Sequence, residues 1–303
     1  MSANTLSWII LTVSLILLFA ALLRFGGSIL RRGGALLDIG APKFPTPMKR
    51  PWAITAAIFL GLSWIPIIIL ADLLIASGTL SFLFPTTLSS WEIQSPVRLL
   101  LGIPFCLLIA PILLRVNRKD YSAFLKASGV TEFRKNGVLL SWIMMVSTIL
   151  LSGLFSAEGS QGSFTQMFNA LYPFSESWIW LSDVQPPLYE ELLYRGVILG
   201  LLLKYTKPWQ AVGITSLLFG SIHYITGGLF PFLWSTFTSL FLFSGLRLIT
   251  GTIWASVFSH FVNNNAASSF TPLAMAFLIT VISAFILGHR REKHTDNTNY
   301  LST

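Results

Sequence analysis

The stretch that decides the fold of this chain is Tyr189-Glu190-Glu191-Leu192-Leu193-Tyr194-Arg195. It lies inside a mostly apolar run over residues 178–203. A charged side chain at the centre of a bilayer costs about 2.5–3.5 kcal/mol on insertion scales, so such residues usually face a protein interior and carry function. The two carboxylates and the arginine therefore predict a functional site inside a membrane-spanning bundle.

The composition of the chain is typical of a membrane protein. Of its 303 residues, 53% are hydrophobic and 11% are charged, whereas soluble domains carry about 25% charged residues. Long apolar runs predict an all-α, polytopic transmembrane helix bundle, because a membrane barrel would show short alternating segments instead. The net charge of +8 indicates no nucleic-acid partner, since the basic residues lie mostly in short connections between apolar runs.

The apolar runs predict about nine spans, and the catalytic bundle is expected in the C-terminal half. They cover residues 6–23, 52–76, 97–114, 137–155, 178–203, 209–225, 229–248, 252–267 and 273–287. Lys and Arg gather after the odd-numbered spans, so the positive-inside rule places the N-terminus outside and the C-terminus in the cytoplasm. The predicted organisation is an N-terminal region of four spans (1–176), a five-span core (177–288) and a polar cytoplasmic tail (289–303).

Two other predicted spans carry polar side chains that we group with the glutamates as candidates for one site. His223 lies in the sixth predicted span, and His260 and Asn264 lie in the eighth. Counted from the cytoplasmic ends of their helices, Glu190 and His223 lie roughly 20 Å deep and His260 roughly 12–14 Å. These depths predict one cluster in the middle-to-outer half of the membrane.

Helical spacing assigns partners to the first two groups. Glu191 and Arg195 are four residues apart and share a helix face, so they are predicted to form an ion pair. Glu190 points about 100° away from Glu191 and is the candidate general base. Phe219 and His223 are also four apart, so the aromatic ring can pack against the imidazole.

His260 and Asn264 have the same spacing and are predicted to reach one cavity. An asparagine amide donates two hydrogen bonds and suits an oxyanion hole. Each residue also has a structural interpretation: the Glu–Arg pair as a salt bridge, the histidines as core residues, and the asparagines as inter-helix hydrogen bonds. The occurrence of all three groups, in order and in separate spans, favours a function.

The ordered pattern Glu-Glu-x-x-x-Arg, Phe-x-x-x-His and His-x-x-x-Asn resembles the CPBP family of intramembrane endopeptidases. That family includes CAAX prenyl proteases and bacterial membrane proteins of the bacteriocin-immunity and abortive-infection types. The resemblance covers about residues 177–287, and every motif position is present. The residues that carry it are Glu190, Glu191, Arg195, Phe219, His223, His260 and Asn264.

The resemblance implies an enzyme that hydrolyses peptide bonds of a membrane-associated or lipidated substrate. Glu190 and His223 would activate the attacking water. Glu191 would orient the site, with Arg195 holding it in place. The expected localisation is multi-pass in a membrane, the plasma membrane in our interpretation, and the expected partners are the bilayer and the substrate.

By the same resemblance, His260 and Asn264 would stabilise the oxyanion. The family has been described both as glutamate-dependent and as metalloproteases. We expect no cofactor, because the chain has no His-Glu-x-x-His helix and Asn264 is a poor zinc ligand. The alternative is a zinc-dependent protease in which Glu190 or Glu191, His223 and His260 hold the metal.

Two functions without proteolysis remain open. The first is a non-catalytic immunity or regulatory protein of the same fold, which a missing motif residue would favour. The second is a secondary transporter that uses Glu190, His223 and His260 as a proton relay. Transporters often contain inverted internal repeats, and none stands out in this sequence.

Overall fold

The computed structural model describes three long parts of the chain and a few isolated positions. The long parts are residues 43–79, 90–131 and 186–266, and the isolated positions are 13, 16, 139–140, 142–143, 146–147, 276, 279–280 and 282–283. Every regular element within these residues is a helix, and none of these residues belongs to a strand. The predicted all-α class is confirmed for this part of the chain.

The chain divides into two compact units, and each is described by itself. The first unit comprises Pro42–Thr131 and Pro173–Leu240, and the second comprises Met1–Ala41, Glu132–Tyr172 and Phe241–Thr303. The first unit therefore contains the two glutamates, Arg195 and His223. The second unit contains His260 and Asn264.

Two described stretches of the first unit are long and apolar enough to cross a membrane. Arg50–Ala76 has 27 residues with a mean hydropathy of 2.4, and Ile93–Leu113 has 21 residues with a mean hydropathy of 2.1. They coincide with the predicted second and third spans. Their elements are α3 (Arg50–Leu62), α4 (Trp64–Ala76), α5 (Ser90–Pro104), the π-helix η3 (Phe105–Ile109) and α6 (Ala110–Leu113).

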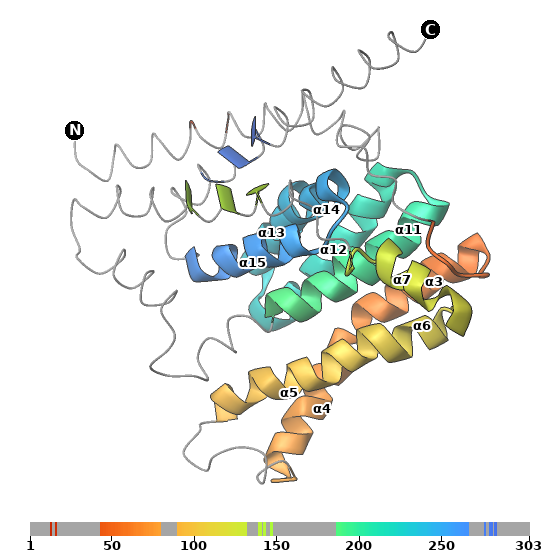
Figure 1. The fold of residues 1–303 in the computed structure, drawn as a ribbon. Helices are drawn as coiled ribbons and strands as arrows, with labels where there is room; N and C mark the ends of the chain where they lie inside the picture. The colour runs from red at the N-terminus through yellow and green to blue at the C-terminus, as the bar shows by residue number, and fades with distance from the viewer. Residues whose placement is uncertain are drawn as a thin grey trace, which may run out of the picture. The chain divides into compact units, whose positions relative to one another are not determined.

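The first of these stretches is interrupted at Ser63, between α3 and α4 (Figure 1). Pro66 explains the break, because proline has no N–H and its ring conflicts with the carbonyl four residues earlier, that of Leu62. The amide and the hydroxyl of Ser63 both donate to the Leu60 carbonyl, at 3.1 Å and 2.6 Å. The interruption therefore lies just before the proline.

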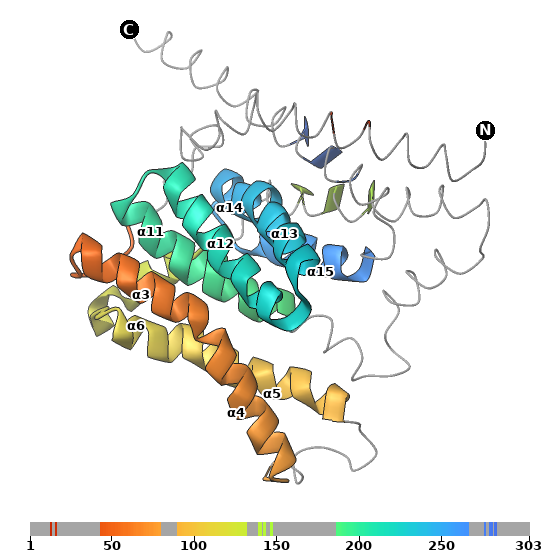
Figure 2. The same ribbon diagram turned by 180° about the vertical axis from the view of Figure 1, so that it is seen from behind.

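Helices α4 and α5 pack against each other (Figures 1 and 2). Ala71 and Val97 are buried at the centre of this contact, and Arg98 Nη2 donates to Asp72 Oδ1 at 3.4 Å. Outward-facing residues elsewhere in the two spanning stretches are apolar: Phe59 in α3 is 71% exposed, and Ile112 in α6 is 73% exposed. Such faces suit contact with lipid rather than water.

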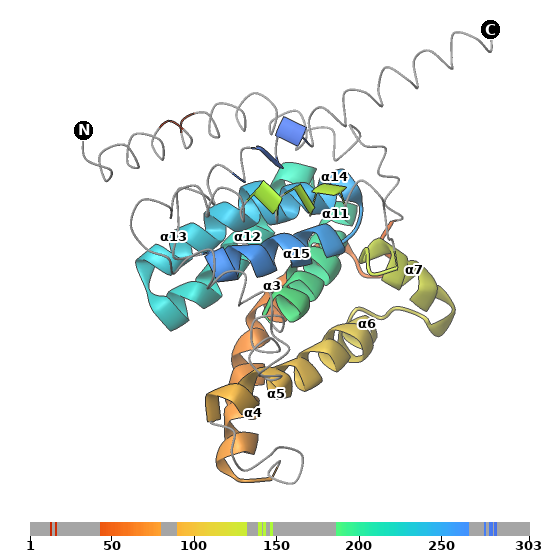
Figure 3. The same cartoon turned by 60° about the vertical axis from the view of Figure 1, so that its left-hand side comes forward.

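The rest of the described first unit builds the surroundings of the glutamates. Residues 186–191 are helical and continue into the π-helix η5 (Leu192–Ile198) and α11 (Leu199–Tyr205). The remaining elements are η4 (Arg118–Asp120), α7 (Tyr121–Ala127), α12 (Pro208–Gly227) and α13 (Leu229–Thr238). Figure 3 shows α6 leading into α7 through a loop, which contains η4.

Helix α12 matches the predicted sixth span and packs along α13 (Figures 1 and 2). It begins with Pro208 in its first turn and ends before Gly228, whose φ of +83° favours glycine. At the crossing with α13, a Cβ on Gly220 would collide with Thr236 Oγ1. Glycine at this position therefore lets the two helices approach closely.

The π-helix η6 (Ser239–Phe243) begins in the last residues of the first unit and ends in the second. In the second unit, α14 (Ser244–Thr250) packs against α15 (Trp254–Ala266). Gly251 ends α14 in the left-handed region with φ +71°, and its amide donates to the Arg247 carbonyl at 2.9 Å. Helix α15 lies within the predicted eighth span.

Several predictions concern residues outside the described parts. The predicted spans 6–23, 137–155 and 273–287 lie there apart from isolated positions, as do the tail 289–303 and the boundary between residues 176 and 177. The count of about nine spans and the orientation of the termini stay predictions.

Candidate active site

The two glutamates lie at the junction between the helical residues 186–191 and η5. Glu190 is 6% exposed, and Glu191 and Arg195 are fully buried. A π-helical segment inserts extra backbone into an α-helix and is often found at functional sites. Here the π-helix η5 begins directly after the glutamates and carries Arg195.

The predicted ion pair between Glu191 and Arg195 is confirmed. Arg195 Nη1 donates to Glu191 Oε1 at 2.9 Å, with both side chains inaccessible to solvent. Arg195 also interacts electrostatically with Glu190, an interaction that helical spacing alone did not assign. One buried cation thus lies beside two carboxylates, which lowers the cost of burying them.

Arg195 connects the glutamates to helix α12. Its Cζ lies 4.3 Å from the centroid of the Phe219 ring, a cation–π contact. The Phe219 ring packs against the His223 ring at a centroid distance of 4.6 Å, as the sequence predicted. Glu191, Arg195, Phe219 and His223 therefore form one continuous set of contacts inside the first unit.

The backbone of Phe219 also determines which ring nitrogen of His223 carries the hydrogen. His223 Nδ1 lies 3.0 Å from the Phe219 carbonyl oxygen. A carbonyl oxygen can only accept, so Nδ1 carries the hydrogen and donates it. In the neutral imidazole the other nitrogen, Nε2, then carries a lone pair and can accept a proton.

Two tyrosines that the sequence analysis did not single out flank the motif. Tyr189 precedes the glutamates and Tyr194 precedes Arg195, and both are fully buried. Their partners, Trp64 and Gly61, lie in the interrupted helix α3–α4. No local spacing could have revealed these contacts, because the partners are more than 120 positions away in the chain.

In the second unit, His260 lies on α15 and is 3% exposed. Its ring stacks on the Phe243 ring at a centroid distance of 4.7 Å and an interplanar angle of 21°. Ser256, one turn earlier on α15, donates its hydroxyl to the Phe243 carbonyl at 2.8 Å. Phe243 therefore holds the imidazole, a role that the sequence analysis did not assign.

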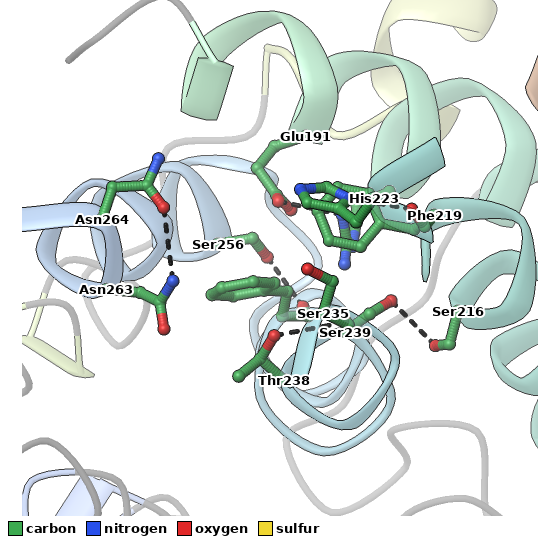
Figure 4. A network of polar contacts seen from close by, with 12 residues as sticks. Glu191, Ser216, Phe219, His223, Ser235, Thr238, Ser239, Ser256, Asn263 and Asn264 are labelled. Carbon is green, nitrogen blue, oxygen red and sulfur yellow. Dashed lines mark hydrogen bonds and ion pairs between the residues drawn. The ribbon is translucent and has the colours of Figure 1, made fainter. Parts of the chain in front are cut away.

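Asn264 lies one turn beyond His260 and is exposed, whereas its neighbour Asn263 is buried. Asn263 Nδ2 donates to Asn264 Oδ1 at 3.3 Å (Figure 4). The Asn264 side-chain oxygen thus accepts a hydrogen bond. Its amide nitrogen is the group that can donate to an oxyanion.

A zinc site was the predicted alternative. Among the residues that the structure describes, no group of three or more His, Cys, Asp or Glu is arranged to hold a metal ion. The Glu191 carboxylate already faces the positive charge of Arg195, which would repel a second cation. The zinc alternative also requires His260 of the second unit, and it stays a prediction.

Residues 173–266 match the family model described as Rce1-like, type II CAAX prenyl endopeptidase. Searches among curated proteins and among solved structures found no match. The matched segment contains all three motifs singled out in the sequence. Together with two helices able to cross a membrane, the match indicates an integral membrane protein. Over residues 173–266, this chain is therefore similar to the Rce1-like family of CAAX-type endopeptidases.

Proposed function

We propose that this protein is an intramembrane endopeptidase that hydrolyses a peptide bond of a lipidated substrate with a water activated by Glu190. The observation that carries this proposal is the Rce1-like match, because the matched residues 173–266 include every motif position. The contacts joining Glu191 to His223 support it, since they bring two of the motifs together on different helices.

In the proposed reaction, Glu190 acts as general base. It takes a proton from water while the water oxygen attacks the carbonyl carbon of the scissile peptide bond. His223 accepts a hydrogen bond from the same water through Nε2. When the carbon–nitrogen bond breaks, Glu190 returns the proton to the leaving amine, so the carboxylate is regenerated.

Glu191 and Arg195 hold the base in place in this proposal. Their 2.9 Å ion pair fixes the helix register around Glu190. The cation–π contact with Phe219 extends that hold to α12 and so to His223. A site held this way needs little reorganisation during the reaction, which is the main source of electrostatic catalysis.

His260 and Asn264 complete the proposal as donors to the oxyanion. The stacking of His260 on Phe243 supports this role, because it holds the imidazole in one orientation. The Asn264 amide nitrogen supplies a second donor. Removing one such donor from an oxyanion hole typically costs about 10²–10³ in kcat.

The proposed substrate is a peptide with a prenylated C-terminal CAAX cysteine, the class named in the family description. The prenyl chain would lie in the hydrocarbon of the bilayer and bring the peptide to the site. We propose a multi-pass arrangement in the plasma membrane with the N-terminus outside, on the basis of the distribution of Lys and Arg.

The test compares cleavage of a farnesylated CAAX peptide by purified wild-type protein and by Glu190→Gln in detergent. Glutamine keeps the size of the side chain and removes the base, so we expect cleavage to fall by at least about 10². The same peptide without the farnesyl chain is the substrate control. Equal cleavage by wild type and Glu190→Gln would reject Glu190 as the base.

A cellular experiment separates the protease from a non-catalytic protein of the same fold. A strain that lacks the gene is complemented with wild type or with Glu190→Gln. Failure of Glu190→Gln to restore the phenotype, at wild-type protein levels, supports the protease. Full rescue by Glu190→Gln favours a non-catalytic role in binding a membrane partner.

A further inference from the structure

Two buried tyrosines beside the glutamates have no part in the proposed reaction. Tyr189 and Tyr194 are fully buried, and each stands immediately before a charged motif residue, Glu190 and Arg195 respectively. Tyr189 directly precedes Glu190 in the chain, and Tyr194 follows Glu190 by four residues, about one helical turn. The two phenols therefore form part of the immediate environment of the proposed base.

Tyr194 joins the motif helix to α3 and to α12. Its hydroxyl donates to the Gly61 carbonyl at 2.7 Å in a buried hydrogen bond. Its ring lies edge-on to the Phe219 ring at a centroid distance of 5.2 Å. Gly61 also packs against Leu218 of α12: a Cβ added at Gly61 would lie 3.1 Å from Leu218 Cδ1. The last turn of α3 thus contacts the two helices that carry the first two motifs.

Tyr189 is enclosed by the two spanning stretches. Its ring lies 4.4 Å from the Trp64 ring, centroid to centroid, at the first residue of α4. On the α5 side, a Cβ on Gly102 would collide with the ring carbons of Tyr189. The ring therefore has little room to move between α4 and α5.

We infer that α3–α4 and α5 position Glu190 for the reaction through the contacts of Tyr194 with Gly61 and of Tyr189 with Trp64 and Gly102. Tyr189 and Tyr194 are positioning residues in this account, because they act on the base and not on the substrate. The inference rests on the proposed function. It gives a role to the N-terminal helices, which lie outside the matched residues 173–266.

Small displacements at a reacting centre have large kinetic effects. A misplacement of about 1 Å can cost about 10² in rate, although no reacting group is lost. Loss of the Tyr194–Gly61 hydrogen bond leaves the Tyr194 ring in place and removes its link to α3. We therefore expect Tyr194→Phe to lower kcat about tenfold, with KM within about twofold of wild type.

The matched control is Tyr121→Phe. Tyr121 makes the same kind of bond, from a phenol to the Leu107 backbone carbonyl at 2.8 Å, and it links α7 to η3. If each tyrosine hydrogen bond contributed only to stability, both variants would lose thermal stability to a similar extent and neither would lose kcat. Positioning predicts that Tyr121→Phe keeps the wild-type kcat and that Tyr194→Phe does not.

A second pair of variants tests the Tyr189 contact. Gly102→Ala places a methyl group against the Tyr189 ring, whereas Gly213→Ala adds one where no atom lies within 4 Å. We expect Gly102→Ala to lower kcat about tenfold and Gly213→Ala to leave kcat unchanged. A wild-type kcat in both Tyr194→Phe and Gly102→Ala overturns the inference.

A readout without substrate keeps the inference separate from the proposed function. Glu190 is buried, so the reagent is a hydrophobic carbodiimide that reaches carboxyl groups inside a membrane protein, and mass spectrometry measures the labelling rate at Glu190. We expect that rate to change at least about threefold in Tyr194→Phe and to stay unchanged in Tyr121→Phe. If wild type cleaves no prenylated peptide, the proposed function fails. The labelling rate still reports whether Tyr194→Phe changes the surroundings of Glu190. An unchanged rate in Tyr194→Phe overturns the inference.

Discussion

Arg195 Nη1 donates a hydrogen bond to Glu191 Oε1 over 2.9 Å, and solvent reaches neither side chain. Such a pair is costly to bury. Replacing only one of its two residues leaves the other charge buried and uncompensated. The same guanidinium lies over the Phe219 ring of α12. The pair therefore influences both stability and the placement of His223.

Arg195→Met should destabilise the protein by about 3–5 kcal/mol, because the Glu191 charge stays buried without its partner. The control is Arg98→Met, which removes a partly exposed pair with Asp72 and should cost about 0–1 kcal/mol. Unfolding followed by denaturant titration in detergent measures both. Equal losses in the two variants would contradict the assigned role of the buried pair.

Restoring charge balance separates stability from activity. The double variant Glu191→Leu with Arg195→Met removes both charges, so it should regain most of the lost stability. Its cleavage of the farnesylated peptide should stay low, since the contact that holds Glu190 and Phe219 is gone. Recovery of both properties would show that the pair has no part in the reaction.

His223→Asn should be folded and inactive. The asparagine amide can still donate to the Phe219 carbonyl, as Nδ1 of His223 does at 3.0 Å, but it has no equivalent of Nε2. Loss of a general acid–base group typically costs about 10²–10⁴ in kcat. Cleavage kinetics and thermal unfolding are measured on the same sample, and activity within about tenfold of wild type would reject the role of Nε2.

Cleavage should be indifferent to a zinc chelator. The Arg195 charge already faces the Glu191 carboxylate, so no added cation is needed to balance it. The measurement is the cleavage rate before and after incubation with the chelator, followed by addition of zinc. Activity that disappears with the chelator and returns with zinc would assign Glu190 or Glu191, His223 and His260 as metal ligands instead.

Gly220→Ala should destabilise the α12–α13 contact by about 1–3 kcal/mol, because the new methyl group collides with Thr236 Oγ1. Gly213→Ala lies on the same helix in open space and should be neutral or stabilising by up to about 1 kcal/mol. Adding Thr236→Ala to Gly220→Ala should restore part of the loss. The rescue should be incomplete, because the Phe232 carbonyl oxygen would still lie 3.0 Å from the added Cβ.

The sequence predicted those features that depend on residues close together in the chain. The sixth predicted span, 209–225, agrees with α12 (Pro208–Gly227) because a proline and a glycine bound a single apolar run. The pairing of Glu191 with Arg195 and the packing of Phe219 on His223 follow from four-residue spacing on one helix face.

The sequence could not predict features that depend on distant partners. The π-helical turn at Leu192–Ile198 leaves the apolar pattern unchanged, since every residue of that turn is buried. The stacking of Phe243 on His260 joins two elements separated by a left-handed turn at Gly251. Likewise, spacing put His260 and Asn264 on one face, but the residues around α15 bury the first and leave the second exposed.

The hydrogen bond between Tyr194 and Gly61 spans 133 positions of the chain and crosses the edge of the matched segment. Exchanging residues 173–266 with the matching segment of another protein would therefore transplant the motifs without the helix that receives the Tyr194 hydroxyl. A chimera that also carries Arg50–Ala76 and Ile93–Leu113 from the same parent keeps both tyrosine contacts. The smallest transferable catalytic unit of this protein is thus discontinuous in sequence.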